Sequence, residues 1–144
     1  MRSDLSGSLV LDASVLVEAV LGTSLSLRLK DALEKEQVLA YVTEVGVAEL
    51  RYVVCRRLGL TESKEKVDKL LGSGYVQVED VSFLIEAAAR LKCERAVSLA
   101  DCFCLALAQY YHCGVLLAKR ENELVREMQK QPFDVKILFL EDYK

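Results

Sequence analysis

The chain reads Ser8-Leu9-Val10-Leu11-Asp12-Ala13-Ser14 near its start, and this stretch decides the class of fold. Residues 8–11 show no alternation of apolar and polar side chains, which is typical of a strand buried on both faces, as in a parallel sheet. The run ends directly at Asp12. Apolar residues then recur at helical spacing over residues 15–21, before Gly22, so the stretch predicts a strand followed at once by a helix.

The same strand-then-helix unit recurs along the chain. We expect strands at residues 8–11, 38–42, 75–78, 115–118 and 135–140, and helices at residues 15–21, 24–35, 44–58, 61–71, 83–92, 99–112 and 120–130. Four hydroxyl residues are placed to cap helices, namely Thr43, Thr61, Ser82 and Ser98. Strands that alternate with helices favour parallel pairing through right-handed crossovers. The sequence therefore predicts an α/β fold, a three-layer α/β/α sandwich around a mainly parallel five-stranded sheet.

The composition fits a single domain over residues 1–144. Apolar residues make up 52% of the chain and charged residues 28%, a balance that favours a sizeable core over disorder. Neither a linker-like stretch nor an internal repeat divides the sequence. No apolar run approaches the roughly 18–20 residues that a membrane span needs, and the first residues lack a signal-peptide layout. We expect a cytoplasmic protein that does not bind membranes.

The cysteines do not predict a metal site or a disulfide framework. There are five, an odd number, and no Cys-x-x-Cys pair occurs among Cys55, Cys93, Cys102, Cys104 and Cys113. These spacings do not match those of zinc sites. We expect reduced cysteines that serve as small core residues.

Four acidic residues occur where such a fold would bring them together. Asp12 ends the first strand, and Glu121 follows the fourth. Glu49 lies in the helix after the second strand, and Asp101 lies in the first turn of the helix before the fourth. In open parallel sheets, ligands bind beyond the carboxyl ends of the strands. We therefore expect the four carboxylates to converge on one edge of the sheet.

Grouped carboxylates favour one kind of chemistry. They cannot all stay ionised at close range without cations, and oxygen ligands without histidine or thiolate suit Mg²⁺ or Mn²⁺. Two such ions, roughly 3.5–4 Å apart, can clamp the attacking and leaving oxygens of a phosphodiester, and a metal-bound water loses its proton near neutral pH. The four acids thus predict metal-dependent phosphodiester hydrolysis.

Each acid taken alone has a simpler interpretation. Asp12 could be a turn residue, and Asp101 could oppose the helix dipole, a contribution of about 0.3–1 kcal/mol. Glu49 and Glu121 could be solvated. The only histidine, His112, lies near a helix end, where we interpret it as a surface or capping residue, so a Ser-His-Asp triad is not expected. The order and spacing of the acids, rather than any one of them, favour a site.

Four stretches of the sequence, in this order, resemble the PIN-domain family, including its ribonuclease toxins of the VapC type. They are Leu11-Asp12-Ala13-Ser14, Thr43-Glu44-Val45-Gly46-Val47-Ala48-Glu49-Leu50, Ser98-Leu99-Ala100-Asp101-Cys102 and Leu116-Leu117-Ala118-Lys119-Arg120-Glu121-Asn122-Glu123-Leu124. The resemblance covers nearly the whole chain. It implies that Asp12, Glu49 and Asp101 are the catalytic, metal-binding acids. Ser14 matches the family's hydroxyl two residues after the first aspartate.

The fourth stretch departs from the family pattern. PIN domains commonly have a threonine followed two residues later by an aspartate, whereas this chain has Lys119 and Glu121 at those places. Glu121 still offers carboxylate oxygens, on a longer side chain, and is the fourth candidate metal ligand. Lys119 and the helix-capping Ser98 are candidate supporting residues beside Ser14.

The resemblance also implies a function and partners. It implies a Mg²⁺- or Mn²⁺-dependent endoribonuclease that acts on RNA as the toxin of a type II toxin–antitoxin pair, with an antitoxin partner and a homodimeric assembly. Helices 44–58 and 61–71 are candidates for partner contact. The net charge of −3 is unlike that of most nucleic-acid binders, but bound metal would invert the field at the acids. Basic residues could form a rim for phosphates: Arg51, Arg56, Arg57, Arg90, Lys92, Arg95, Lys119 and Arg120.

An alternative function is a catalytically inactive PIN-like module that binds protein or RNA, and the departures at Lys119 and Glu121 keep it open. Other enzyme classes fit the sequence less well. A receiver domain needs paired acids after the first strand, and a haloacid-type phosphatase needs a second aspartate in place of Ser14. The chain also lacks a glycine-rich phosphate loop.

Overall fold

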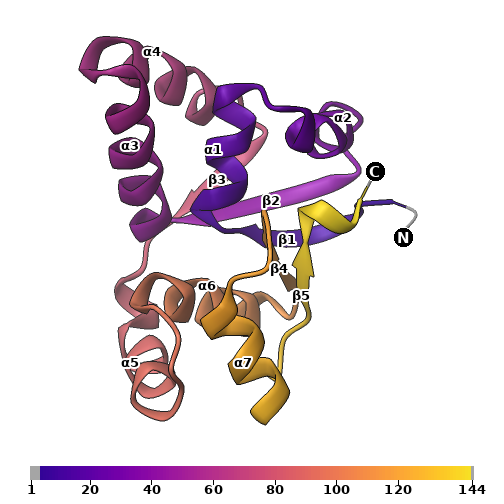
Figure 1. Ribbon diagram of the computed structural model, residues 1–144, viewed down its shortest axis with the longest axis vertical. Helices are drawn as coiled ribbons and strands as arrows, with labels where there is room; N and C mark the ends of the chain where they lie inside the picture. The colour runs from indigo at the N-terminus through magenta and orange to yellow at the C-terminus, as the bar shows by residue number, and fades with distance from the viewer. Residues whose placement is uncertain (1–3, 144) are drawn as a thin grey trace.

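The computed structural model describes residues 4–143 and has three layers (Figure 1). The strands are β1 (Gly7–Leu11), β2 (Val38–Thr43), β3 (Val76–Glu79), β4 (Gly114–Leu117) and β5 (Ile137–Phe139). The α-helices are α1 (Ala13–Leu21), α2 (Leu27–Glu34), α3 (Glu44–Leu58), α4 (Leu60–Leu71), α5 (Ile85–Glu94), α6 (Leu99–Tyr111) and α7 (Asn122–Lys130). Helices α1–α4 cover one face of the sheet and α5–α7 the other (Figure 1), which confirms the predicted α/β/α sandwich. Within the described residues, no helix has the length and apolarity needed to cross a membrane.

All the strand pairings of the sheet are parallel, in the order β3-β2-β1-β4-β5. The chain builds outward from β1 to β3 and then returns to place β4 on the other side of β1, where Leu11 pairs with Leu116. The connections that leave β1 and β4 therefore run to opposite faces of the sheet. Such a switch point opens a crevice at the carboxyl edge, and Asp12 is the first residue after β1 at this edge.

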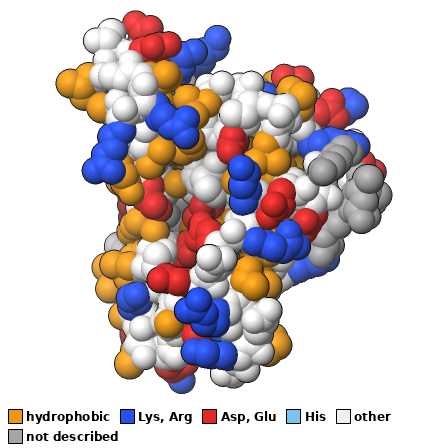
Figure 2. Space-filling model, in the orientation of Figure 1, with side chains coloured by type: hydrophobic (Ala, Val, Ile, Leu, Met, Phe, Trp, Pro, Cys, Tyr) orange, Lys and Arg blue, Asp and Glu red, His pale blue; other side chains and the backbone are white. Residues whose placement is uncertain are grey.

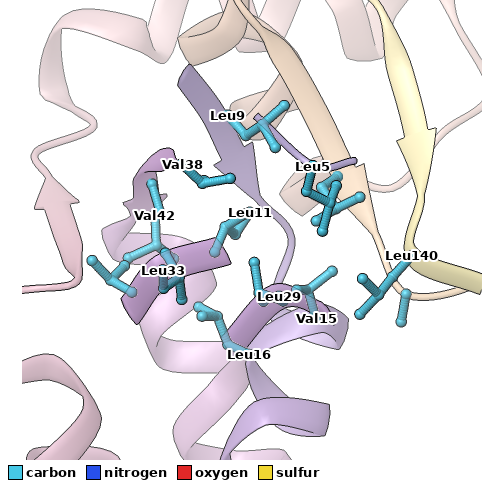
Figure 3. Close-up of a cluster of buried hydrophobic side chains, with 14 of the residues drawn as sticks. Leu5, Leu9, Leu11, Val15, Leu16, Leu29, Leu33, Val38, Val42 and Leu140 are labelled. Atoms are coloured by element: carbon cyan, nitrogen blue, oxygen red, sulfur yellow. The ribbon is translucent and has the colours of Figure 1, made fainter. Parts of the chain in front are cut away.

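The core divides between the two faces because successive residues of a buried strand point to opposite sides. Leu9 and Leu11 pack into the cluster beneath α1 and α2, whereas Val10 packs into the cluster beneath α6. Figure 3 shows Leu11, Leu16 and Leu29 in the first cluster. Each of these leucines is completely buried, which stabilises the fold by about 1.5–3 kcal/mol a side chain. The unbroken apolar run of β1 is thus explained by burial on both sides.

Two predicted helices begin differently in the structure. The segment expected as one helix over residues 24–35 starts with a 3₁₀ turn, η1 (Ser24–Ser26), and becomes α-helical at Leu27. The Ser26 hydroxyl and backbone N–H both donate to the Thr23 carbonyl, at 2.7 and 3.1 Å, which tightens this turn. The prediction that Thr61 caps the next helix was wrong. Gly59, at φ +86°, reverses the chain so sharply that α4 begins at Leu60.

Three further boundaries were also predicted incorrectly. Ser82 begins a 3₁₀ turn, η2 (Ser82–Leu84), rather than capping α5, and its N–H donates to the Asp80 carboxylate at 2.8 Å. The last helix begins at Asn122 and not at Arg120, because the Arg120 N–H donates to Glu141 at 2.7 Å instead of entering the helix. Strand β5 is shorter than predicted, because Leu140 starts a third 3₁₀ turn, η3 (Leu140–Asp142).

The cysteine prediction holds in part. All five thiols are free. Cys102 and Cys104 are buried core residues of α6, whereas Cys55 and Cys113 are half-buried and Cys93 is exposed. His112 ends α6 in the left-handed conformation, at φ +53°, so its interpretation as an exposed capping residue is confirmed.

Candidate functional site

Asp12 is held at the switch point by hydrogen bonds on both sides. Its backbone N–H donates to the Leu116 carbonyl of β4 at 2.9 Å, and its carboxylate accepts from the Ser14 N–H at 2.9 Å as the N-cap of α1. The side chain is 94% buried, with 6% exposed. Asp12 is therefore the N-cap of α1, rather than only a turn residue, and at the same time a fixed carboxylate at the crevice between β1 and β4.

Glu49 reaches the same crevice from the second turn of α3. Thr43 caps this helix by accepting from the Gly46 N–H at 2.9 Å, as predicted. Gly46 lets the helix approach β2 closely, because a Cβ at this position would lie 3.0 Å from Val42 Cγ2. Burial raises the pKa of Glu49, and the nearby charges of Asp12 and Glu121 raise it further.

Asp101 lies in the first turn of α6, on the other side of the crevice. Ser98 caps the helix by accepting from the Asp101 N–H at 3.1 Å. Burial, together with the charges of Asp12 and Glu121, raises the pKa of Asp101 to about 8. A carboxyl with so high a pKa binds a proton at neutral pH unless a cation takes its place.

Glu121 lies at the rim of the crevice, immediately before α7, in an extended conformation. Its pKa is raised by partial burial and by the charges of Asp12 and Glu123. The segment before it is tied to α1, because the Ser14 hydroxyl accepts from the Ala118 N–H at 3.1 Å. The β4–α7 connection is thus fixed relative to Asp12 and Ser14.

One pocket of about 500 Å³ is lined by every residue that the sequence analysis assigned to a site. These residues are Asp12, Glu49, Asp101, Glu121, Ser14, Ser98 and Lys119. Figure 2 shows acidic side chains gathered in the middle of this face of the molecule, between the two helical layers. The structure brings the predicted residues together, and their roles in binding or catalysis stay predictions.

The donor set of this pocket fits a hard divalent cation by its chemistry. Four carboxylates come from four different segments of the chain, and the pKa values of Glu49, Asp101 and Glu121 are raised mainly by burial and further by nearby acidic charges. As placed, however, no three acidic, histidine or cysteine side chains of residues 4–143 are arranged to enclose a metal ion. Binding would therefore require at least some of these side chains to shift, which the attraction of a cation favours.

Sequence analysis missed one acidic residue of the pocket. Glu18 also lines it, from the second turn of α1. Glu18 stands four residues after Ser14, so the two share a face of the helix, and this spacing was the available signal. From the sequence, Glu18 was placed only within the helix expected over residues 15–21.

A second pocket, of about 720 Å³, lies between α3 and α4. It is lined by both apolar and charged side chains, including Tyr52, Leu60 and Arg51. Tyr52 and Leu60 are 47% and 80% exposed. None of the acids predicted for the metal site lines this pocket, so it is separate from the candidate centre.

Comparison with known proteins gives one family. A model of the PIN domain matches residues 9–129, whereas no curated protein matches the sequence. Among solved structures the chain is similar to VapC20 of Mycobacterium tuberculosis, a toxin that cleaves the Sarcin-Ricin loop, with a TM-score of 0.65, 17% identity, and coverage of 82% of this chain and 93% of that one. It is also similar to VapBC2 of Rickettsia felis bound to promoter DNA, with a TM-score of 0.66, 16% identity, and coverage of 91% of this chain and 97% of that one. A third similar structure is a toxin–antitoxin complex of Klebsiella pneumoniae, with a TM-score of 0.63, 14% identity, and coverage of 92% of this chain and 97% of that one. At these identities the structural likeness concerns the fold.

Proposed function

This chain belongs to the PIN domain family, and from that premise we propose that it is a metal-dependent endoribonuclease. The observation that carries the proposal is the single pocket lined by Asp12, Glu49, Asp101 and Glu121 at the carboxyl edge of the sheet. The crowded carboxylates, with their raised pKa values, favour a cation over an empty pocket. Mg²⁺ or Mn²⁺ suits such oxygen donors.

In this proposal, Asp12, Glu49 and Asp101 hold the cation and Glu121 assists from the rim. When bound, the cation would supply a hydroxide nucleophile and stabilise the charge that develops on the phosphate. The Ser14 N–H holds the Asp12 carboxylate and the Leu116 carbonyl holds its backbone. Asp12 therefore needs little reorganisation to bind a cation. Ser98 fixes the first turn of α6 and thereby the position of Asp101.

The test of this function is cleavage of single-stranded RNA by the purified protein. Excess EDTA should abolish cleavage, and Mg²⁺ or Mn²⁺ should restore it. We expect this dependence because no histidine lines the pocket as an alternative base. Activity that is undiminished in EDTA would exclude the metal mechanism.

We further propose that the protein acts as the toxin of a type II toxin–antitoxin pair, as a homodimer in the cytoplasm. The support is the similarity of fold to VapC20 and to two toxin–antitoxin complexes. Our candidate surface for the antitoxin is the second pocket, between α3 and α4, where Tyr52 and Leu60 are exposed. The mass of the native complex isolated from the source cell distinguishes a monomer, a homodimer and a complex with a second protein.

The rival function is an inactive PIN-like module that binds protein or RNA. It is favoured by Lys119 and Glu121 in place of the family's residues, and by the finding that no three side chains of residues 4–143 are grouped to hold a metal ion. RNA binding without any metal-dependent cleavage would support this rival.

A further inference from the structure

The candidate pocket has an unequal balance of charge. Its lining includes five acidic residues, Asp12, Glu18, Glu49, Asp101 and Glu121, and Lys119 is the one basic residue among the described residues that line it. No ion pair within residues 4–143 includes Lys119. Lys119 thus lines the acidic pocket from an exposed position and makes no ion pair with its acids.

The backbone on both sides of Lys119 is fixed. The Ala118 N–H donates to the Ser14 hydroxyl at 3.1 Å, and the Ala118 carbonyl accepts from the Glu141 N–H at 3.0 Å. The Arg120 N–H donates to the Glu141 carboxylate at 2.7 Å. Lys119 therefore stands between two anchored residues, at the edge of the pocket.

Arg120 is held away from the pocket by the η3 turn. Its guanidinium donates twice to the Asp142 carboxylate, at 2.8 Å for each bond, and lies over the Phe139 ring, 4.6 Å from the centroid. Such bidentate pairing fixes the direction of the side chain. The expectation that Arg120 belongs to a basic rim for phosphates is therefore not supported, and Lys119 remains as the cation of this connection that lines the pocket.

We propose that Lys119 binds a phosphate of the RNA substrate, taking the place that a threonine commonly has in the family. This inference rests on the proposed function. Cations bound by the acids neutralise much of the pocket's negative charge, which leaves the compact lysine ammonium as a point charge for a phosphate oxygen. The anchored backbone limits the conformational freedom that Lys119 loses on contact.

The test compares Lys119→Met and Lys119→Arg with wild type, and uses Lys66→Met, an exposed lysine of α4, as a matched control. The probe is a 2′-O-methyl single-stranded RNA, and its dissociation constant is measured with Mn²⁺ at several salt concentrations. Lys119→Met should bind about tenfold more weakly. Its slope of log affinity against log salt should be shallower by about 0.7, which corresponds to one phosphate contact on a single strand. Lys119→Arg should keep the wild-type slope.

A second measurement separates this role from neutralisation of the acids. If Lys119 binds phosphate, Lys119→Met leaves the Mn²⁺-induced rise in Tm unchanged. Unchanged RNA affinity and slope in Lys119→Met overturn the proposal, as does an altered Mn²⁺ effect without any change in RNA binding. If wild type cleaves RNA only with metal while Lys119→Met binds and cleaves normally, the inference fails and the proposed function stands.

Discussion

At the scale of single residues, Asp12 has two separable tasks. Its carboxylate caps α1 by accepting the Ser14 N–H at 2.9 Å, and it also lines the acidic pocket. An asparagine can still accept this hydrogen bond, because its side-chain carbonyl takes the place of one carboxylate oxygen. The capping task therefore survives Asp12→Asn, whereas the task of binding a cation does not.

We predict that Asp12→Asn keeps the fold and loses the activity. Without metal, its Tm should equal or exceed that of wild type, because repulsion within the pocket is relieved. RNA cleavage should fall by at least about 100-fold, since losing a metal ligand costs several kcal/mol of transition-state stabilisation. Asp101→Asn should behave in the same way. Cleavage at the wild-type rate by Asp12→Asn would reduce Asp12 to a cap.

Glu121 should give a graded result. Glu121 is exposed at the rim of the pocket, and its backbone is extended immediately before α7. We predict that Glu121→Gln weakens Mg²⁺ binding and lowers cleavage less than Asp12→Asn does, and that Glu121→Asp, the usual family residue, retains or raises activity. A loss in Glu121→Gln as complete as that in Asp12→Asn would contradict this ranking. Wild-type metal affinity in Glu121→Gln would restrict the site to the other three acids.

At the scale of elements, Arg95 joins the end of α5 to α7. Its guanidinium donates to the Glu127 carboxylate at 3.0 Å and to the carbonyls of Glu127 and Gln131, and it lies over the Phe133 ring, 3.7 Å from the centroid. Only 11% of the Arg95 side chain and 8% of the Glu127 side chain are exposed. This buried pair fixes α7 and the loop after it against the α5–α6 turn.

The Arg95–Glu127 pair predicts a dependence of stability on pH. Arg95 holds the pKa of Glu127 below its usual value of 4.5. The folded state therefore releases this proton more readily than the unfolded state, so the pair stabilises the fold above about pH 4.5 and its contribution is lost as the pH falls through the lowered pKa. Urea unfolding at several pH values should show this loss in wild type, and a smaller one in Arg95→Met. Arg90→Met is the control, because its pair with Glu94 is exposed, and it should follow wild type.

The positions of residues and the boundaries of elements show what the sequence could predict. Asp12 and Asp101 lie where the sequence predicted them, because each follows a local signal. Asp12 comes directly after an apolar run, and Asp101 comes three residues after the capping hydroxyl of Ser98. The start of α7 was missed because it depends on a hydrogen bond between the Arg120 N–H and Glu141, which is 21 residues further along the chain. The order of the strands was not predicted, since it arises from pairing between distant segments. Local patterns correctly predicted the caps at Thr43 and Ser98 but not those expected at Thr61 and Ser82, and contacts between remote elements set the start of α7.

At the scale of the whole molecule, negative charge is concentrated where an anionic substrate would have to bind. The chain has a net charge of −3, and its acidic side chains gather in the hollow between the two helical layers, with Lys and Arg side chains on either side (Figure 2). RNA would be repelled from such a pocket while it is empty and attracted once cations fill it. The account therefore depends on one property, the binding of divalent cations by the carboxylates of the pocket.

Calorimetric titration with Mn²⁺ measures that property directly. We predict saturable binding by wild type, and no measurable binding by the double variant Asp12→Asn/Asp101→Asn, which keeps both helix starts intact because neither cap hydrogen bond needs a charge. A double variant that is folded and binds Mn²⁺ as wild type does, or a wild type that binds none, would contradict the account.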